Sequence, residues 1–116
     1  MDVKAVFHID WDQEENLVMA ITNITNLLKI VQAGEASICV LANGPAVKLF
    51  QHERASGYVS DIQGLSDRGV LFRLCNNALN HFGIAGEKLI GPCEIVPAGI
   101  MELIRLQAEG YAYIKP

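Results

Sequence analysis

Cysteine is the residue type in this sequence with the widest range of chemistry, and the chain holds three of them, Cys39, Cys75 and Cys93. Their odd number and wide separations fit neither a disulfide framework nor a CxxC metal knuckle, so we expect three free thiols. Cys75 differs from the other two in its position. The apolar run VLFRL, residues 70–74, comes directly before it, and a helical pattern begins directly after it at Asn76. Cys75 is therefore expected at the junction between a strand and a helix.

A thiol at the start of a helix lies close to unpaired backbone N–H groups and to the positive end of the helix dipole. Both favour the thiolate, which is the nucleophilic form of cysteine. The alternative is that Cys75 is a small buried hydrophobe, which is the usual role of a lone free cysteine. Cys39, in the middle of the run ASICVLA, and Cys93, beside Pro92, are expected to have this packing role.

The histidines and glycines do not have the spacing of a metal or nucleotide site. His8, His52 and His81 show no HExxH or other paired spacing, so we expect no metal. Glycine-rich loops of the GxGxxG or GxxxxGKS kind are missing, which disfavours nucleotide binding through a phosphate loop. We therefore predict no cofactor, and we interpret His52 and His81 as surface residues.

Strands and helices are predicted to alternate along the chain. The segments with the composition of buried strands are residues 3–9, 36–42, 70–74, 93–96 and the closing YAYI. The helical segments are one from an Asp12–Glu15 capping box to a stop at Gly34, then 45–50, 76–82 and one from about 100 to a stop at Gly110. Residues 51–69 are predicted to be a surface loop with one helical turn at 59–66. This alternation predicts an α/β layer fold with a mostly parallel sheet of about five strands and helices on both faces.

Ligands and chemistry gather beyond the carboxyl ends of the strands in such a sheet. The residues at those ends are His8 and Asp10, Asn43 and Gly44, Cys75 and Asn76, and the turn at 97–99. These positions define the edge at which a site is expected.

Each polar residue at that edge has a chemical and a structural interpretation. His8 could lend a positive charge or a proton to a neighbouring thiolate, or it could be a hydrogen-bonded structural histidine. Asn43-Gly44 could let the backbone approach a ligand, although a generic turn is favoured. Asn76 could contact a bound anion, although helix capping is the commoner use of asparagine there. For Asp10 we favour a turn or cap role.

Composition and charge limit the partners. The 116 residues are 51% hydrophobic and 19% charged, which is typical of one globular domain, here residues 1–116. A net charge of −4, with nine scattered Lys and Arg residues, argues against nucleic acid and against an anionic membrane surface. The N-terminal MDVKAVFHID has no secretory pattern, and no apolar run approaches the ~20 residues that span a bilayer. We therefore expect a cytoplasmic protein.

The motifs around Cys75 resemble those of a known family. A strand that ends in Cys75, followed by Ala78-Leu79 and then Gly83, resembles the DsrE/DsrF-like (DsrE/TusD) family of small intracellular sulfur-relay proteins. The segments VFHID at 6–10, Asn43-Gly44, VPAGI at 96–100 and the closing EGYAYIKP resemble its single-domain, mostly uncharacterised members. The resemblance covers essentially the whole chain.

The resemblance implies a three-layer α/β/α sandwich, assembly into trimers or hexamers, and a cysteine that accepts and passes on a persulfide sulfur. That cysteine corresponds to Cys75, with His8, Asn43, Gly44 and Asn76 as candidate binding residues at the same edge. Sulfur donor and acceptor proteins would be its partners. The alternative is a non-enzymatic module of the same fold, in which this edge only binds a small ligand or a partner.

Aromatic residues near the two ends of the sheet raise a separate question. Trp11 follows the first strand, and Tyr111 and Tyr113 lie in the closing segment, which no further chain covers. These side chains could form an interface between subunits, because oligomer interfaces bury large apolar groups. Ordinary packing against the first or last helix is the equally weighted alternative.

Overall fold

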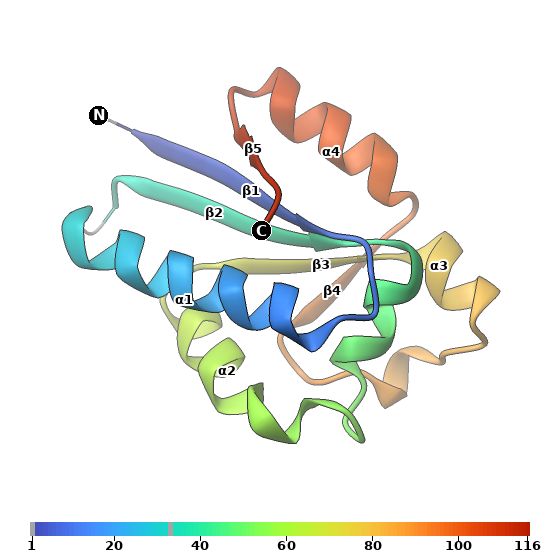
Figure 1. Cartoon of the computed structure of the whole chain (residues 1–116). Coiled ribbons are helices and arrows are strands. Elements are labelled where there is room, and N and C mark those ends of the chain that lie inside the picture. The colour runs from blue at the N-terminus through green and yellow to red at the C-terminus, as the bar shows by residue number, and fades with distance from the viewer. Residues whose placement is uncertain (1, 33) are drawn as a thin grey trace.

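The computed structural model describes residues 2–32 and 34–116, which form a sheet of five strands (Figure 1). The strands are β1 (Val3–Ile9), β2 (Ala36–Ala42), β3 (Leu71–Cys75), β4 (Cys93–Val96) and β5 (Ala112–Ile114). Their order is β4-β3-β2-β1-β5, and every neighbouring pair is parallel. The predicted sheet of about five mostly parallel strands is confirmed.

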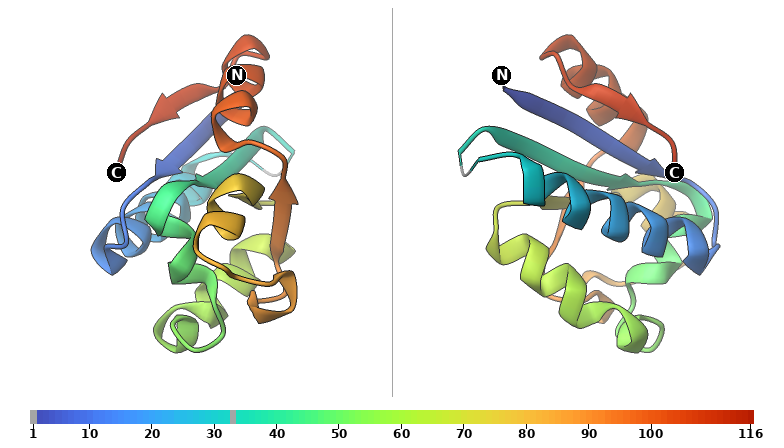
Figure 2. Two further views of the ribbon diagram at one scale, coloured as in Figure 1. Left: turned by 90° about the vertical axis from the view of Figure 1, so that its right-hand side faces the viewer. Right: turned by 60° about the vertical axis from the view of Figure 1, so that its left-hand side comes forward.

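Helices cover both faces of this sheet. The α-helices are α1 (Glu14–Ile30), α2 (Val59–Asp67), α3 (Asn76–His81) and α4 (Gly99–Ala108), and the 3₁₀ helices are η1 (Gly44–Phe50), η2 (Ala55–Gly57) and η3 (Gly86–Lys88). The turned views place α4 on one side of the sheet and α1 with α2 on the other (Figure 2). The molecule is therefore the three-layer α/β/α sandwich that was predicted.

The two layers of helices bury different amounts of the sheet. Phe7, Val40 and Phe72 belong to a large core that also contains side chains from α1, α2, α3 and η1. On the opposite face, a smaller core joins Val6 and Leu41, among others, to Leu103 and Leu106 of α4. Strands covered on both faces need no polar alternation, which explains continuous apolar runs such as ASICVLA.

The start of α1 differs from the prediction. The helix begins at Glu14 with Gln13 as its N-cap and has no side-chain cap, so the expected Asp12–Glu15 capping box is wrong. Asp12 instead pairs with Arg54, at 2.7 Å between the carboxylate and Nη2. The Asp12 carboxylate, which the local spacing assigned to the helix cap, therefore forms an ion pair with Arg54 from a distant segment.

Residues 51–69 are more ordered than predicted. The helical turn expected at 59–66 is a nine-residue helix, α2, and η2 precedes it. Tyr58, Ile62 and Leu65 of this segment are buried in the larger core, and the Tyr58 hydroxyl donates a hydrogen bond to the Leu49 carbonyl. The surface-loop prediction was wrong because this segment has few apolar residues at helical spacing, and its glycines and charges outnumber them.

None of the helices within residues 2–32 and 34–116 combines the length and the apolar composition needed to cross a bilayer.

Replacing Ile62 by alanine tests the packing of α2. Ile62 is fully buried, so Ile62→Ala should lower the free energy of unfolding by about 2–5 kcal/mol. The matched control is Ile30→Ala in α1, where the side chain is 82% exposed and the change should stay within about 0.5 kcal/mol. Urea denaturation measures both values, and equal effects of the two substitutions would mean that α2 does not pack on the core.

Candidate functional site

A pocket of about 510 Å³ opens at the carboxyl edge of the sheet, where β2 and β3 end. Its lining comes from η1, α3 and the start of α4, and consists of Asn43, Gly44, Pro45, Cys75, Asn77, Ala78, His81, Phe82, Ala98, Gly99 and Ile100. Of the residues predicted for this edge, the pocket therefore brings together Cys75, Asn43 and Gly44. His8 and Asn76 do not line it.

Cys75 is both the last residue of β3 and the N-cap of α3. The strand runs one residue further than predicted, and the helix begins at Asn76 as expected. No side chain caps α3, so the N–H groups of its first turn have neither an intrahelical partner nor a side-chain one. The thiol is buried, with only 7% of the residue exposed.

A second helix begins over the same cysteine. A Cβ atom placed on Gly99, the first residue of α4, would lie 2.9 Å from Asn43 Cβ and 3.2 Å from Cys75 Cβ. The first separation is shorter than real Cβ contacts and the second is tight, so a glycine lets the backbone approach this closely. The N-cap of α4 is Ala98, which has no side-chain group that could cap the helix. The N–H groups in the first turn of α4 therefore lack an intrahelical partner, and this turn lies beside Cys75.

The other two thiols have a different environment. Burial raises the pKa of Cys39 to about 12 and that of Cys93 to about 12, because a thiolate is poorly solvated in the interior. Cys39 lies within the core under α4, and Cys93 packs against the larger core. Both thiols stay protonated at neutral pH, which agrees with the packing role predicted for them.

His8 links the pocket wall to the edge of the sheet. Its Nε2 lies 2.7 Å from Asn43 Oδ1, and its Nδ1 lies 2.5 Å from the Tyr113 hydroxyl. The ring is also packed edge-on to Tyr113, with ring centroids 5.5 Å apart. Strand β2 lies between β1, which carries His8, and β3, which carries Cys75. His8 therefore acts on the pocket through Asn43, and not by direct contact with the thiol.

Gly44, Asp10 and Asn76 have mainly structural environments. Gly44 has a φ of +55°, and a Cβ there would lie 3.1 Å from the Asp10 carbonyl, so the favoured turn role fits its geometry. Asp10 forms an ion pair with Lys115. Asn76 does not cap α3, because the N-cap position falls on Cys75 itself. The capping role expected for Asn76 is wrong, and its neighbour Asn77 lines the pocket together with Asn43.

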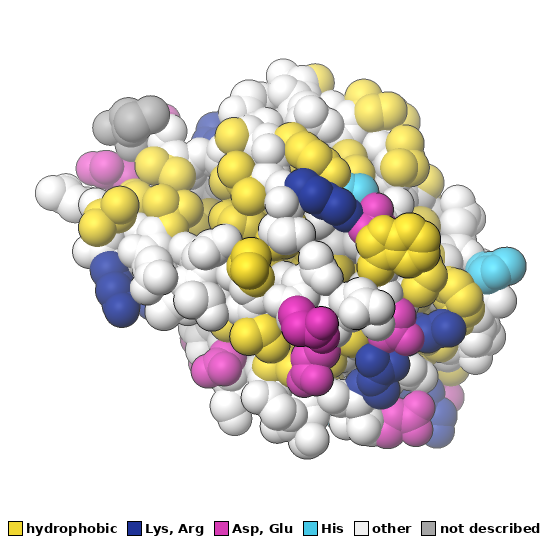
Figure 3. All heavy atoms as spheres, viewed as in Figure 1, with side chains coloured by type: hydrophobic (Ala, Val, Ile, Leu, Met, Phe, Trp, Pro, Cys, Tyr) yellow, Lys and Arg dark blue, Asp and Glu magenta, His cyan; other side chains and the backbone are white. Residues whose placement is uncertain are grey.

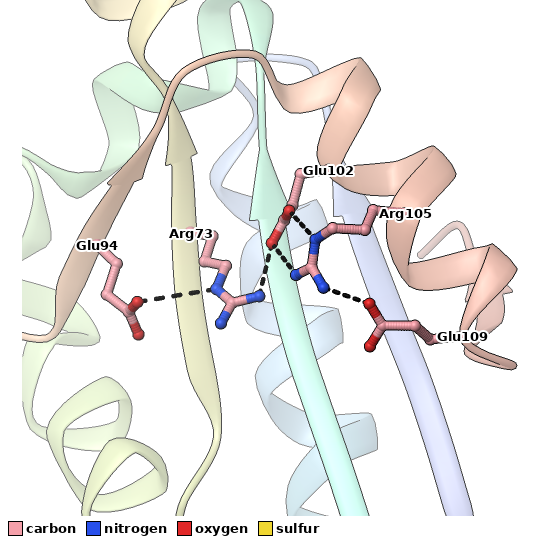
Figure 4. Close-up of polar contacts among 5 residues, drawn as sticks. All are labelled: Arg73, Glu94, Glu102, Arg105 and Glu109. Atoms are coloured by element: carbon pink, nitrogen blue, oxygen red, sulfur yellow. Dashed lines mark hydrogen bonds and ion pairs between the residues drawn. The ribbon is translucent and has the colours of Figure 1, made fainter.

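A charged cluster holds α4 against the sheet (Figure 4). Arg73 Nη1 on β3 donates to Glu102 Oε2 on α4 at 2.6 Å, and Arg105 donates two further hydrogen bonds of 2.8 Å to the same carboxylate. Glu94 lies 3.8 Å from Arg73, and Glu109 pairs with Arg105. Glu102 is buried one turn after Gly99, so this cluster fixes the position of the helix start above Cys75.

The sequence interpretation missed most of this geometry. Within α4, Ile100 and Ile104 are exposed, and Leu103 and Leu106 form the buried face, a division that the sequence analysis did not make. An arginine within the otherwise apolar VLFRL was the available signal for the charged cluster. Tyr113 was predicted only as an interface or packing residue, and its hydrogen bond to His8 was missed. His81 is exposed, as predicted, but it also lines the pocket.

Among residues 2–32 and 34–116, no three His, Cys, Asp or Glu side chains are grouped closely enough to hold a metal ion. The polar groups at this edge are the thiol, the amide groups of Asn43 and Asn77, the imidazole of His81, and the backbone N–H groups of two helix starts.

These features define a class of small α/β/α sandwich proteins that present a thiol at the carboxyl edge of an all-parallel sheet. The chain belongs to the DsrE/DsrF-like family, whose family model matches residues 4–116. The resemblance indicated by the motifs around Cys75 is thereby confirmed. No curated protein matches the chain.

Solved structures support the same assignment. The chain is similar to MTH1491 from Methanobacterium thermoautotrophicum, a protein of unknown function, with a TM-score of 0.88 and 35% identity over 99% of this chain and 100% of that chain. The ychN protein from E. coli has a TM-score of 0.81 at 18% identity, with coverage of 98% and 99%. BT1422 from Bacteroides thetaiotaomicron has a TM-score of 0.64 at 16% identity, with coverage of 97% and 94%. At these lower identities the last two share the fold alone.

The charged cluster predicts a pH-dependent stability. Hydrogen bonds from Arg105, and then the charge of Arg73, lower the pKa of Glu102 below its usual value of 4.5. Ionised Glu102 therefore stabilises the fold above about pH 4.5, and this contribution is lost as the pH falls through the lowered pKa. Glu102→Gln should cost about 3 kcal/mol at pH 7, because Arg73 and Arg105 lose the buried carboxylate that accepts from both and keep only the more exposed Glu94 and Glu109.

Denaturant unfolding at pH 7 and at acid pH measures this difference, which should shrink as the pH falls below 4.5. Asp12→Asn, in the more exposed Asp12–Arg54 pair, is the control and should cost no more than about 1 kcal/mol at pH 7. A cost for Glu102→Gln that is no larger than the control at pH 7 would contradict the assigned role of the cluster.

Proposed function

We propose that this protein carries sulfane sulfur as a persulfide on Cys75. The observation that carries the proposal is the position of this thiol in a pocket between the starts of α3 and α4, neither of which has a side-chain cap. Membership of the DsrE/DsrF-like family supports sulfur relay as the general role. The raised pKa values of Cys39 and Cys93, about 12 for each, leave Cys75 as the candidate nucleophile.

The transfer needs no change in oxidation state overall and no second cysteine in the chain. The Cys75 thiolate attacks the outer sulfur of a donor hydropersulfide, a new S–S bond forms, and the donor's S–S bond breaks. The donor leaves as a thiolate and takes up the proton. In the second step an acceptor thiolate attacks the outer sulfur on Cys75, and Cys75 leaves as a thiolate again.

The pocket suits both states of the sulfur. Backbone N–H groups at helix starts donate hydrogen bonds to anions, so the first turns of α3 and α4 can stabilise a thiolate or a persulfide anion. The terminal sulfur of a persulfide extends about 2 Å beyond the cysteine sulfur. A pocket of about 510 Å³ has room for that atom and for the approaching group of a donor or acceptor.

A second candidate function is non-covalent binding of a small ligand or partner in the same pocket. The apolar side chains of Pro45, Ala78, Phe82 and Ile100 favour it, since small-molecule sites are mostly apolar with a few polar groups. Asn43, Gly44, Asn77 and His81 would then set the polar side of the site, with His8 behind Asn43. The two candidates differ in whether Cys75 forms a covalent bond to sulfur.

Persulfide labelling tests the proposal. After incubation with a small hydropersulfide such as cysteine persulfide, mass spectrometry of the intact protein should show the addition of one sulfur atom. Peptide analysis should place that sulfur on Cys75. Cys75→Ser should reduce the label to background, because Cys39 and Cys93 remain protonated. The double variant Cys39→Ala, Cys93→Ala is the control and should label like the wild type. Equal labelling of the wild type and Cys75→Ser would favour the binding function.

We also propose that the protein works as a trimer or hexamer. Exposed hydrophobic side chains on several elements support this, including Trp11 after β1, Met19 on α1, and Met101 on α4. The face that α1 crosses carries several such groups among its charges (Figure 3). Oligomer interfaces commonly bury groups of this kind.

Light scattering after size exclusion checks the assembly. The measured mass should be three or six times the chain mass of 12.7 kDa. Trp11→Ser should shift the population toward monomer if Trp11 lies in an interface. A monomeric mass for the wild type at micromolar concentration would contradict the proposed assembly without affecting the proposal for Cys75.

A further inference from the structure

Two hydrogen bonds join an edge strand to the wall of the Cys75 pocket. Tyr113 on β5 contacts His8 on β1 through the hydroxyl at 2.5 Å, and His8 contacts Asn43, after β2, at 2.7 Å. His8 is 7% exposed, and His8 and Glu102 are the two polar or charged side chains buried among the described residues. Glu102 accepts hydrogen bonds from two charged arginines, whereas both partners of His8, Tyr113 and Asn43, are uncharged.

The chemistry of the three side chains fixes the direction of each hydrogen bond. An amide oxygen can only accept, so His8 Nε2 carries a hydrogen and donates it to Asn43 Oδ1. In the neutral ring, Nδ1 is then an acceptor, and the Tyr113 hydroxyl donates to it. Asn43 Oδ1 thus requires the Nε2–H tautomer of His8, the Tyr113 hydroxyl supports it by donating to Nδ1, and the contact keeps the Asn43 amide oxygen turned toward His8.

This orientation leaves the amide nitrogen of Asn43 available to the pocket. Asn43 lines the pocket beside Cys75, and the Cβ atoms of both residues lie against Gly99. Within the described part of the chain, no buried side-chain nitrogen or oxygen lacks a partner, and the hydrogen bond found for the Asn43 amide is through its oxygen. The Nδ2 group therefore has no hydrogen-bond partner among the described residues and is not buried, and it belongs to a residue that lines the pocket.

We propose that Asn43 donates a hydrogen bond from Nδ2 to the anionic sulfur on Cys75, and that His8 and Tyr113 are positioning residues for this contact. The inference deepens the function proposed above, since the sulfur is either the Cys75 thiolate or the terminal sulfur of its persulfide. The amide supplies a side-chain donor on the β2 side of the pocket, where the helix starts supply only backbone donors. Both ring nitrogens of His8 are engaged by Tyr113 and Asn43, and no hydrogen bond joins His8 to Cys75.

Asn43→Asp separates the donor role of Asn43 from its structural role. Aspartate keeps the oxygen that accepts from His8, so the fold should be retained. It loses the N–H donor and places a negative charge beside the sulfur. The rate constant for alkylation of Cys75 by iodoacetamide at pH 7 should fall about tenfold, because the thiolate loses a hydrogen bond and gains a repulsive neighbour. Asn23→Asp on the exposed face of α1 is the matched control and should react like the wild type.

Substitutions of His8 and Tyr113 test the positioning roles. His8→Leu releases the amide of Asn43 and should slow alkylation about threefold or more. His8→Gln should recover part of that loss, because its amide N–H can still donate to Asn43 Oδ1. Tyr113→Phe should lower the Nε2–H signal of His8 relative to Nδ1–H in a long-range ¹⁵N–¹H NMR spectrum.

Three outcomes would overturn the inference: alkylation of Asn43→Asp at the wild-type rate, no recovery by His8→Gln relative to His8→Leu, or a wild-type His8 that carries its proton on Nδ1 alone. Alkylation does not depend on sulfur transfer, so the inference and the proposed function can fail separately. If Cys75 accepts no persulfide but the alkylation order holds, the contact stands and the carrier function falls. If Cys75 accepts a persulfide but the order fails, the reverse is true.

Discussion

The close contact between the first turn of α4 and the ends of β2 and β3 is the constraint on which the site depends. It requires a residue without a side chain, because a Cβ on Gly99 would lie 2.9 Å from Asn43 Cβ. It also requires an attractive interaction between α4 and the sheet. Glu102 on α4 provides one by accepting a hydrogen bond from Arg73 on β3, and Arg105 donates to the same carboxylate. A buried ion pair contributes more to the arrangement of parts than to net stability. In this protein the ion pairs of Glu102 position the first turn of α4 over the Cys75 thiol.

The two faces of the sheet are stabilised by different kinds of contact. The face covered by α1, α2, α3 and η1 holds most of the apolar core and secures the fold. The face covered by α4 holds a smaller core together with the buried polar groups His8 and Glu102. Buried polar groups need complete hydrogen bonding and so permit few geometries. The α4 face is therefore specified by directional contacts, and the opposite face by close packing.

Much of the fold could be predicted from local patterns. Apolar runs such as ASICVLA indicate strands covered on both faces, and Gly83, at a φ of +66°, marks the end of α3. The junction at Cys75 could also be predicted, since a strand pattern meets a helical one there. Two of the errors share one cause, which is a partner distant in sequence. Asp12 was assigned to a cap and pairs with Arg54, and the short apolar spacing of α2 has meaning only against the core.

The short strand β5 gives the end of the chain an influence over the site. It has three residues and lies at the edge of the sheet, paired only with β1 among the described strands. Asn16 donates to the Pro116 carbonyl and Asp10 pairs with Lys115, so a few polar contacts hold this segment in place. Edge strands and chain ends are the parts of a fold that open most readily. Because Tyr113 lies on β5, fraying of this strand would break its hydrogen bond to His8, which lies two strands from the thiol.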